Sequence, residues 1–576
     1  MSYYGNRQEW EGVDIIWTLE IEYFGQVFRF ASFAMDLLDN DGKSYPYTSG
    51  LEDVVINSSI KKVGDYSGQE DSVSMSITFP NLNIAQNQIK GNFIEGSKAL
   101  IGYVLIKNGQ IQNSYDDRPI VFNGIITGPN YGFPNRDVGY IEFSIENKGF
   151  ISSKSILSLI MGSNMYIESI SCTNAFYVKP EWDYDKGLVE VNETHRGKVI
   201  PFVFGNLTSI QQSNGDTIGI PITPAYILAA DPVTGNYYFL IAGHNTTSTT
   251  VKIYNDIGQI YSPVDVGSFV NIDNRTITYF ILPDFVTFNT PLNNGNDPLE
   301  VWVEWDNGGT YPNPLGEGTL EGGGDICLWL LSQLTKDLDY EAWNGLRVFL
   351  NQYKFGGYIN DDKISVFQWL QKNIVAYLPI SIVNGPKGLK PVLDLFQIGA
   401  DIRPRLIITT GTEFQRASAV ISVNTPEDIT NHVIVRYAFN GITKIYSTFV
   451  QASNEIPSSS QLASISYIAH PKSMLSIQRY GKKEKTIALD YCYDNNTAQR
   501  IAQDIISREA LPIKTIQYSV SIKYGYLILG DIIQLTDEEI GLYGYYGQII
   551  SKVFDDNRWL IDIKIDDNPL RYNRNV

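Results

Sequence analysis

The run VSMSITF, residues 73–79, decides the fold class of this chain. Apolar and polar residues alternate along its whole length up to Pro80, so every second side chain lies on the same face of an extended strand. The runs YIEFSIE, residues 140–146, and LIDIKI, residues 560–565, alternate in the same way. Such runs predict strands that bury one face.

The composition also favours strands. The 576 residues include 37 Tyr, 26 Phe and 48 Gly, which fits several antiparallel sheets or barrels joined by turns. The sequence DNDG at 39–42 stands between apolar runs and predicts a hairpin turn. We therefore expect a mainly β, multidomain protein of antiparallel β-barrels or sandwiches with a small α+β module.

One helix is expected from Asp325, which is a suitable N-cap. Its apolar positions fall on one helical face and are Ile326, Trp329, Leu330, Leu334 and Leu338. We expect this helix to serve packing rather than cofactor binding.

Two further helices are expected downstream. The first opens at Ser365, where Gln368 completes a capping box, and its apolar face continues through Ile374. The second has apolar residues at helical spacing from Ala498 to Ile506 and ends before Leu511. Both have the pattern of packing helices.

These elements divide the chain into five regions. The regions are an N-terminal β-barrel at 1–150, a connector at 151–190, a second β-rich domain at 191–315, a small α+β domain at 316–400, and a C-terminal β-barrel with an embedded helix at 401–576. The stretch NGGTYPNPLG, residues 307–316, is the clearest linker.

The charge balance excludes two classes of protein. The chain has 63 Asp and Glu against 44 Lys and Arg, a formal net charge of −19, with 19% charged and 43% hydrophobic residues. This composition is too apolar for disorder along the whole chain. An acidic chain without a Lys/Arg cluster is also not expected to wrap nucleic acid through phosphate contacts.

Cysteine use and hydropathy indicate synthesis in a cytoplasm. Cys172, Cys327 and Cys492 lie far apart and the chain has only four histidines, so we expect reduced, buried thiols rather than disulfides or a zinc site. The polar start lacks a signal-peptide core, and no apolar stretch approaches the length of a transmembrane helix.

Catalytic signatures are absent from the sequence, including HExxH, GxSxG, the Walker A loop and GxGxxG. The Asp39–Gly42 turn is a poor calcium loop because Lys43 stands at a ligand position. His195 and His244 are expected as exposed loop histidines. We therefore expect no enzyme, no cofactor and no catalytic, cofactor-binding or metal residues, although paired carboxylates for glycoside hydrolysis stay open.

The C-terminal stretch resembles the end of bacteriophage tail-tip and baseplate hub proteins. A helix at 497–509 is followed by a strand at 515–522, by the segment LILGDIIQLT at 527–536, and by closing strands at 546–554 and 559–565. In that segment Gly530-Asp531 would make a tight turn into a strand whose apolar residues face a barrel interior.

Other segments agree with this resemblance in their order along the chain. The strands around WTLEI at 17–21 and FRFA at 28–31 are similar to the opening of tail-tip proteins, and KVIPFVFG at 198–205 to a strand near the middle of such hubs. The helices from Asp325 and Ser365 resemble their small α+β module. Unlike longer hubs of the lambda type, the chain ends at Val576 without a fibronectin-like or fibre extension, which argues against receptor binding.

The resemblance implies a structural virion protein at the distal end of a phage tail, made in the bacterial host cytoplasm. Hubs of this family form homotrimers in which each subunit contributes two tube-like barrels, joining a sixfold tail tube to threefold tip, spike or fibre proteins. The implied partners are the tail tube, distal tail, tape measure and central spike or fibre proteins. Genomic DNA would pass through the channel without specific binding during ejection, and an acidic lumen would repel its phosphates.

Two alternatives remain open. One is a tail-associated cell-wall lysin or polysaccharide depolymerase, and the other is a receptor- or carbohydrate-binding tail protein with exposed aromatic residues. As interaction candidates with mainly structural roles we select the Gly530-Asp531 turn, Trp329 and Trp369.

Overall fold

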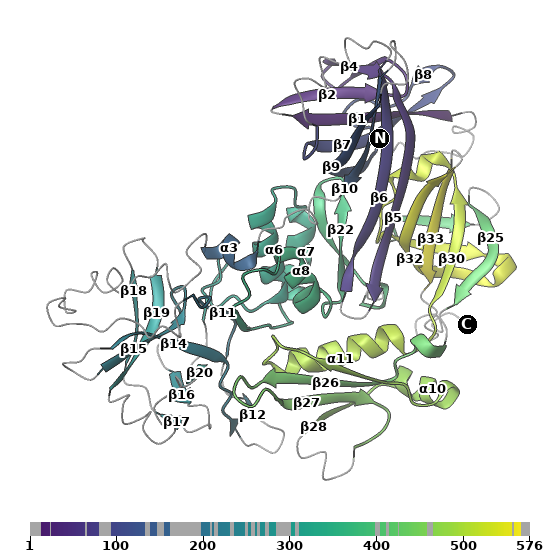
Figure 1. Ribbon diagram of the computed structural model, residues 1–576. Coiled ribbons are helices and arrows are strands. Elements are labelled where there is room, and N and C mark those ends of the chain that lie inside the picture. Colours follow the sequence, from purple (N-terminus) through teal and green to yellow (C-terminus); the bar gives the residue numbers. More distant parts are fainter. Residues whose placement is uncertain are drawn as a thin grey trace.

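The computed structural model describes most of the chain, with gaps. The described residues are 13–23, 25–63, 66–79, 94–132, 139–146, 155–161, 197–207, 210–211, 217–230, 236–247, 251–254, 260–261, 265–270, 276–283, 301–305, 310–397, 404–409, 414–423, 426–457, 465–555 and 558–565. Strands dominate them and form several sheets, which confirms the predicted mainly β, multidomain fold. Figure 1 shows one sheet at the left, helices in the centre and a large sheet at the right.

The large sheet has sixteen strands drawn from both ends of the chain. The N-terminal ones are β1 (Val13–Tyr23), β2 (Gln26–Ala31), β3 (Met35–Leu38), β4 (Ser44–Ser49), β5 (Leu51–Val63), β6 (Tyr66–Phe79), β7 (Lys98–Lys107), β8 (Gln110–Ile111), β9 (Ile120–Gly132) and β10 (Gly139–Glu146). The C-terminal ones are β24 (Leu406–Thr409), β25 (Phe414–Val423), β30 (Lys514–Val520), β31 (Ile532–Asp537), β32 (Leu542–Asp555) and β33 (Arg558–Ile565). The predicted alternating strands at 73–79, 140–146 and 560–565 lie in β6, β10 and β33 and are confirmed.

The two groups of strands join at one seam, where β5 pairs with β32. The strand order is β25-β30-β33-β32-β5-β6-β10-β9-β7-β1-β2-β4-β3, with β8 beside β7 and β31 and β24 following from β32. At the seam Asn57 pairs antiparallel with Val553, and Ser59 with Ser551. One hydrophobic cluster contains core residues of both groups, such as Trp17 and Trp559, whose rings lie 6.3 Å apart. The two β units therefore share one core as well as one sheet.

The DNDG turn between β3 and β4 has the predicted hairpin form. Asp39 Oδ1 accepts hydrogen bonds from the backbone N–H of Asp41 at 3.0 Å and of Lys43 at 2.8 Å. Gly42 has a φ of 84°, which glycine adopts without strain. The Asp39 carboxylate thus caps its own turn.

The middle of the chain forms a separate seven-stranded sheet, ordered β17-β16-β20-β14-β15-β19-β18. Its strands are β14 (Thr223–Ala230), β15 (Asn236–Ala242), β16 (Val251–Tyr254), β17 (Ile260–Tyr261), β18 (Asp265–Val270), β19 (Thr276–Pro283) and β20 (Val301–Trp305). Short elements near it are α3 (Ile156–Met161), β11 (Phe202–Phe204), β12 (Ile210–Gln211) and β13 (Thr217–Ile218).

The α+β module contains one more helix than the sequence predicts. It comprises α6 (Gly323–Leu334), α7 (Tyr340–Leu350), α8 (Val366–Leu370) with the π-helical turn η6 (Gln371–Val375), and strands β21 (Gly357–Ile359), β22 (Ile380–Gly385) and β23 (Gly388–Leu393). The predicted cap at Ser365 is confirmed, because its hydroxyl accepts from Gln368 N–H at 3.3 Å.

The predicted N-cap at Asp325 is wrong. Gly322 caps α6, and the helix ends at Leu334, so Leu338 lies outside it. The Asp325 carboxylate instead pairs with the Arg347 guanidinium on α7. The Arg347 charge and the amide donors of Asn313 and Asn351 overcome the effect of burial and lower the pKa of Asp325.

The chain between β25 and β30 forms a four-stranded sheet with two helices. The elements are β26 (His432–Phe439), β27 (Tyr446–Ser453), β28 (Ile465–Ala469), α10 (Pro471–Tyr480), β29 (Glu484–Ala488) and α11 (Asn495–Glu509). The third predicted helix is confirmed as α11. Here β26–β29 and β27–β28 pair in parallel, as do β2–β4 and β24–β31, whereas the sequence predicts antiparallel sheets. Helix α10 carries the chain from β28 to β29, which form the two opposite edges of this sheet.

The described end of the predicted linker is packed rather than free. Thr310 is fully buried and its hydroxyl donates to the Gly205 carbonyl at 2.9 Å. The Tyr311 ring lies 5.0 Å from that of Phe202 and 5.4 Å from that of Trp329. An aromatic side chain among the glycines and prolines anchors this segment to the core, while the predicted domain limits stay a prediction.

Short 3-10 turns complete the described elements. They are η7 (Leu395–Gln397), η8 (Pro426–Asp428), η9 (Ile522–Tyr526) and η10 (Glu538–Ile540). No helix in the described part of the chain is long and apolar enough to cross a membrane.

Candidate interaction sites

The Gly530-Asp531 turn has the predicted tight geometry. Gly530 has a φ of +85°, and its N–H donates to the Ile549 carbonyl at 2.8 Å. The Asp531 carboxylate accepts from the Ile528 N–H at 3.0 Å, and β31 starts at the next residue. The turn therefore sets the start of β31 against β32.

A buried lysine that the sequence did not single out lies near this turn. Lys552 is 6% exposed, and its ammonium donates to the carbonyls of Gly525 and Leu527 and lies 3.9 Å from the Trp559 ring centroid. Burial lowers the pKa of Lys552 to about 7, partly opposed by the Asp531 carboxylate. Burial likewise raises the pKa of Asp531.

We predict that Lys552 makes folding stability depend on pH. Its pKa falls from 10.5 in the unfolded chain to about 7 in the fold, so between these values the unfolded chain binds more protons. The free energy of unfolding therefore rises with pH between about pH 7 and pH 10.5. Below pH 7 Lys552 makes no further contribution to the pH dependence. Relative to Lys552→Met, the unfolding free energy of the parent protein should gain about 2 kcal/mol from pH 7 to pH 9.

Chemical denaturation of both proteins at several pH values measures this gain. The Met variant loses two buried hydrogen bonds at every pH, so its unfolding free energy differs from that of the parent protein throughout. The test is how this difference between the two proteins changes with pH, not how large it is at one pH. Equal pH slopes for the two proteins would contradict the prediction.

Trp329 and Trp369 both lie in the core. Trp369 is 2% exposed, with its ring centroid 5.7 Å from that of Phe204 and 5.1 Å from that of Tyr491. Trp329 is 8% exposed and packs against Phe202 at 6.0 Å. Neither presents a surface to a partner. Both belong to one hydrophobic cluster, whereas Leu529, next to the Gly530 turn, belongs to another.

The expectation that His244 is an exposed loop histidine is wrong. It is 9% exposed, and its Nε2 accepts from the Val203 N–H at 3.0 Å because the loop folds back against β11. Burial lowers the pKa of His244 to about 4, so the ring is neutral. His195 and Cys172 lie outside the described residues, whereas Cys327 and Cys492 are free and buried as expected.

No group of three His, Cys, Asp or Glu side chains within the described ranges is arranged to hold a metal ion. Burial lowers the pKa of His470 to about 4, assisted by the Lys472 charge. Burial also lowers the pKa of His432, which the Lys482 charge reinforces. The His470 ring is therefore neutral near neutral pH, and burial favours the neutral form of His432 as well.

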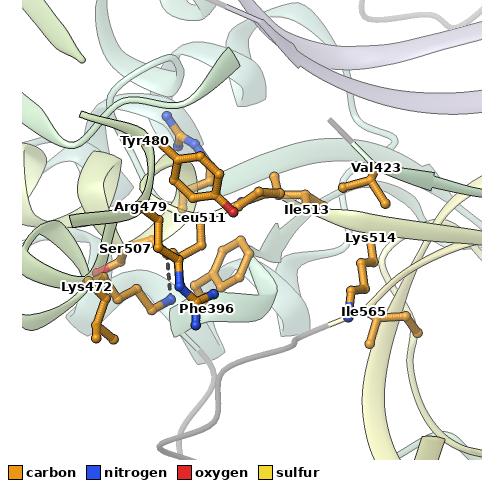
Figure 2. Close-up of a pocket in the computed structure, with 13 residues that line it drawn as sticks. Phe396, Val423, Lys472, Arg479, Tyr480, Ser507, Leu511, Ile513, Lys514 and Ile565 are labelled. Carbon is orange, nitrogen blue, oxygen red and sulfur yellow. Dashed lines mark hydrogen bonds between the residues drawn. The ribbon is translucent and has the colours of Figure 1, made fainter. Parts of the chain in front are cut away.

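A pocket of about 400 Å³ lies where α10 and the end of α11 meet the ends of β25, β30 and β33. We call it the junction pocket. Figure 2 shows Arg479 and Tyr480 entering it from α10, Lys514 from β30 and Phe396 from η7. The two helices beside the four-stranded sheet and three strands of the sixteen-stranded sheet thus both contribute walls.

The junction pocket is cationic although the chain as a whole is acidic. Lys472, Arg479, Arg508 and Lys514 line it, and the described residues of its lining include no Asp or Glu. The Lys472 ammonium donates to the Ser507 carbonyl at 2.8 Å and lies 4.8 Å from the Phe396 ring centroid. Arg508 is neutralised by carboxylates behind the wall, those of Glu509 at 2.8 Å and Asp394 at 3.5 Å.

Sequence reasoning missed this pocket because it missed α10. Two terminal signals mark that helix, namely Pro471 at its first turn and Gly481, with a φ of 72°, just after its end. These two signals would have predicted a helix that carries Lys472 and Arg479. They could not have predicted that this helix faces Lys514 across a pocket.

One of three comparisons with known proteins points to a phage tail protein, over part of the chain. Residues 463–549, which contain α10, α11 and the Gly530-Asp531 turn, match the model of the family Phage-tail_3, described as "Putative phage tail protein". No curated protein matches the chain. The family match covers residues 463–549 alone and supports a protein of phage-tail type.

Two solved structures have limited similarity. The virion of a native gene transfer agent particle has a chain with 12% identity and a TM-score of 0.36, covering 67% of this chain and 88% of that one. The PlzA protein of Borreliella burgdorferi in complex with c-di-GMP has 10% identity and a TM-score of 0.11, covering 47% and 84%. Both TM-scores are low, so neither similarity enters the functional argument.

Proposed function

We propose that this protein is the hub at the distal end of a phage tail, a non-enzymatic homotrimer that joins the sixfold tail tube to threefold tip proteins. The observation that carries the proposal is the β5–β32 seam, which fuses two β units into one sheet and one core. With two fused β units in each of its three subunits, the trimer would present six β units to the sixfold tail tube. The phage-tail family match at 463–549 supports the same context.

In this proposal the hub contacts the tail tube, distal tail, tape measure and spike or fibre proteins. The genome passes through its channel during ejection. A net charge of −19 would keep DNA phosphates from adhering to an acidic channel wall. A charge map of the assembled trimer tests this point, and a neutral or basic wall would contradict it.

The oligomeric state tests the hub proposal directly. We expect light scattering of the purified chain to give three times the mass of one chain, and negative-stain images to show rings with a central opening. If the chain alone is monomeric, addition of the tail tube protein should produce the same rings.

A chain that stays monomeric under both conditions contradicts the hub proposal. A zymogram and a dye-release assay on host cell walls and capsule then separate the lysin and depolymerase alternatives. Clear hydrolysis would overturn the non-enzymatic part of the proposal even if rings form.

A further inference from the structure

We propose that the junction pocket binds a small organic phosphate, with the phosphate held by the cationic side chains of the lining and a flat or apolar group held by its apolar side chains. This inference does not depend on the hub proposal. It rests on the size, lining and charge of the pocket.

The size and lining suit a small molecule with two unlike ends. Its volume of about 400 Å³ falls within the range of about 300 to 1,000 Å³ that is typical of small-molecule sites. Leu511, Pro512 and Ile513 form an apolar side, next to the half-buried ring of Tyr480. Lys472 and Arg479 bring positive charge from α10, and Lys514 brings it from β30 (Figure 2).

The charge favours a phosphate over a carboxylate. A phosphate monoester carries about −1.5 to −2 at neutral pH, and several cations without a lining carboxylate suit such a dianion. Arg479 is exposed and has neither an ion pair nor a hydrogen bond within the described part of the chain, so its guanidinium can turn to a ligand. Arg508 contributes less, because Glu509 and Asp394 already balance it.

The acidic background makes binding at this pocket specific. A chain of net charge −19 repels anions as a whole, so an anion that binds must find a local excess of positive charge. The pocket also has walls from the helices α10 and α11 and from strands of the sixteen-stranded sheet, so an occupant would tie α10 to β30. Since only the folded chain has this pocket, an occupant should raise the unfolding temperature.

Isothermal titration calorimetry of the full chain tests the proposal with phenyl phosphate, inorganic phosphate and glycerol 3-phosphate as probes. We expect one phenyl phosphate per chain, bound at least about fivefold more tightly than either other probe because of the apolar side. The affinity should fall as salt is added.

Variants of single residues locate the binding. Arg479→Gln should weaken phenyl phosphate binding about tenfold. Tyr480→Ala should remove most of the preference for phenyl phosphate while keeping the affinity for inorganic phosphate. Lys387→Gln is the matched control, because it removes one positive charge from an exposed side chain that pairs with Glu341 outside the pocket. Circular dichroism verifies that each variant is folded.

Three results would overturn the proposal. The first is no binding of any probe at low salt. The second is equal weakening by Arg479→Gln and Lys387→Gln, which would mean that only the general charge matters. The third is tighter binding of glycerol 3-phosphate than of phenyl phosphate, which would exclude the flat group and indicate a lipid headgroup instead.

Discussion

Gly530→Ala should destabilise the protein by about 2 to 5 kcal/mol, for two separate reasons. A φ of +85° costs an alanine about 1 to 2 kcal/mol relative to glycine. In addition, a Cβ at this position would lie only 2.2 Å from Cγ1 of Val392 on β23, and relieving such overpacking typically costs about 1 to 3 kcal/mol more. Thermal or denaturant unfolding measures the loss.

Two variants separate these contributions. Gly541 has a similar φ of +73°, but its Cβ would meet nothing within 4 Å, so Gly541→Ala should cost only the backbone term of about 1 to 2 kcal/mol. Adding Val392→Ala to Gly530→Ala should recover part of the loss by making room for the new methyl group. If Gly530→Ala and Gly541→Ala are equally stable, the contact with Val392 is not a constraint.

Trp369→Ala should cost about 3 to 5 kcal/mol, because it empties a large volume in the core. The side chain packs between Phe204 of β11 and Tyr491, which precedes α11, so the variant loosens the contacts of α8 with both β11 and that connection. Trp369→Phe keeps a ring in the site and should cost clearly less.

A matched exposed residue makes this test sharp. Tyr543 on β32 is 64% exposed, and Tyr543→Ala should change the unfolding free energy by no more than about 0.5 kcal/mol. A Trp369→Ala protein as stable as the parent, but unable to assemble, would instead assign this tryptophan to an interface.

The sequence was informative where one face of an element is apolar. The period-two runs at 73–79 and 560–565 and the apolar face of α11 identified their elements, because burial of one face fixes the pattern. Helix α10 is different, because its fully buried residues are Ser473 and Ser476, which hydrogen-bond to Asn431. A face that is buried through small polar residues is not marked by an apolar pattern in the sequence.

The candidate sites depended on contacts that no local pattern contains. Asp325 looked like an N-cap from its position before an apolar run. Its actual partner, Arg347, lies on α7, a helix that was not predicted, so the ion pair could not be foreseen. The junction pocket needs Phe396, Arg479 and Lys514 to meet from separate elements. Net charge gave no hint of it, since a local cationic site can exist on a chain with a large excess of acidic residues.

The β5–β32 seam has a consequence for biosynthesis. Asn57 pairs with Val553, so nearly the whole chain must be translated before this partner leaves the ribosome. At about 5 to 20 residues per second, the nascent chain waits roughly 25 to 100 seconds with the edge of β5 open. An open strand edge invites pairing with other chains, so the late C-terminal strands act as the protein's own protection against aggregation.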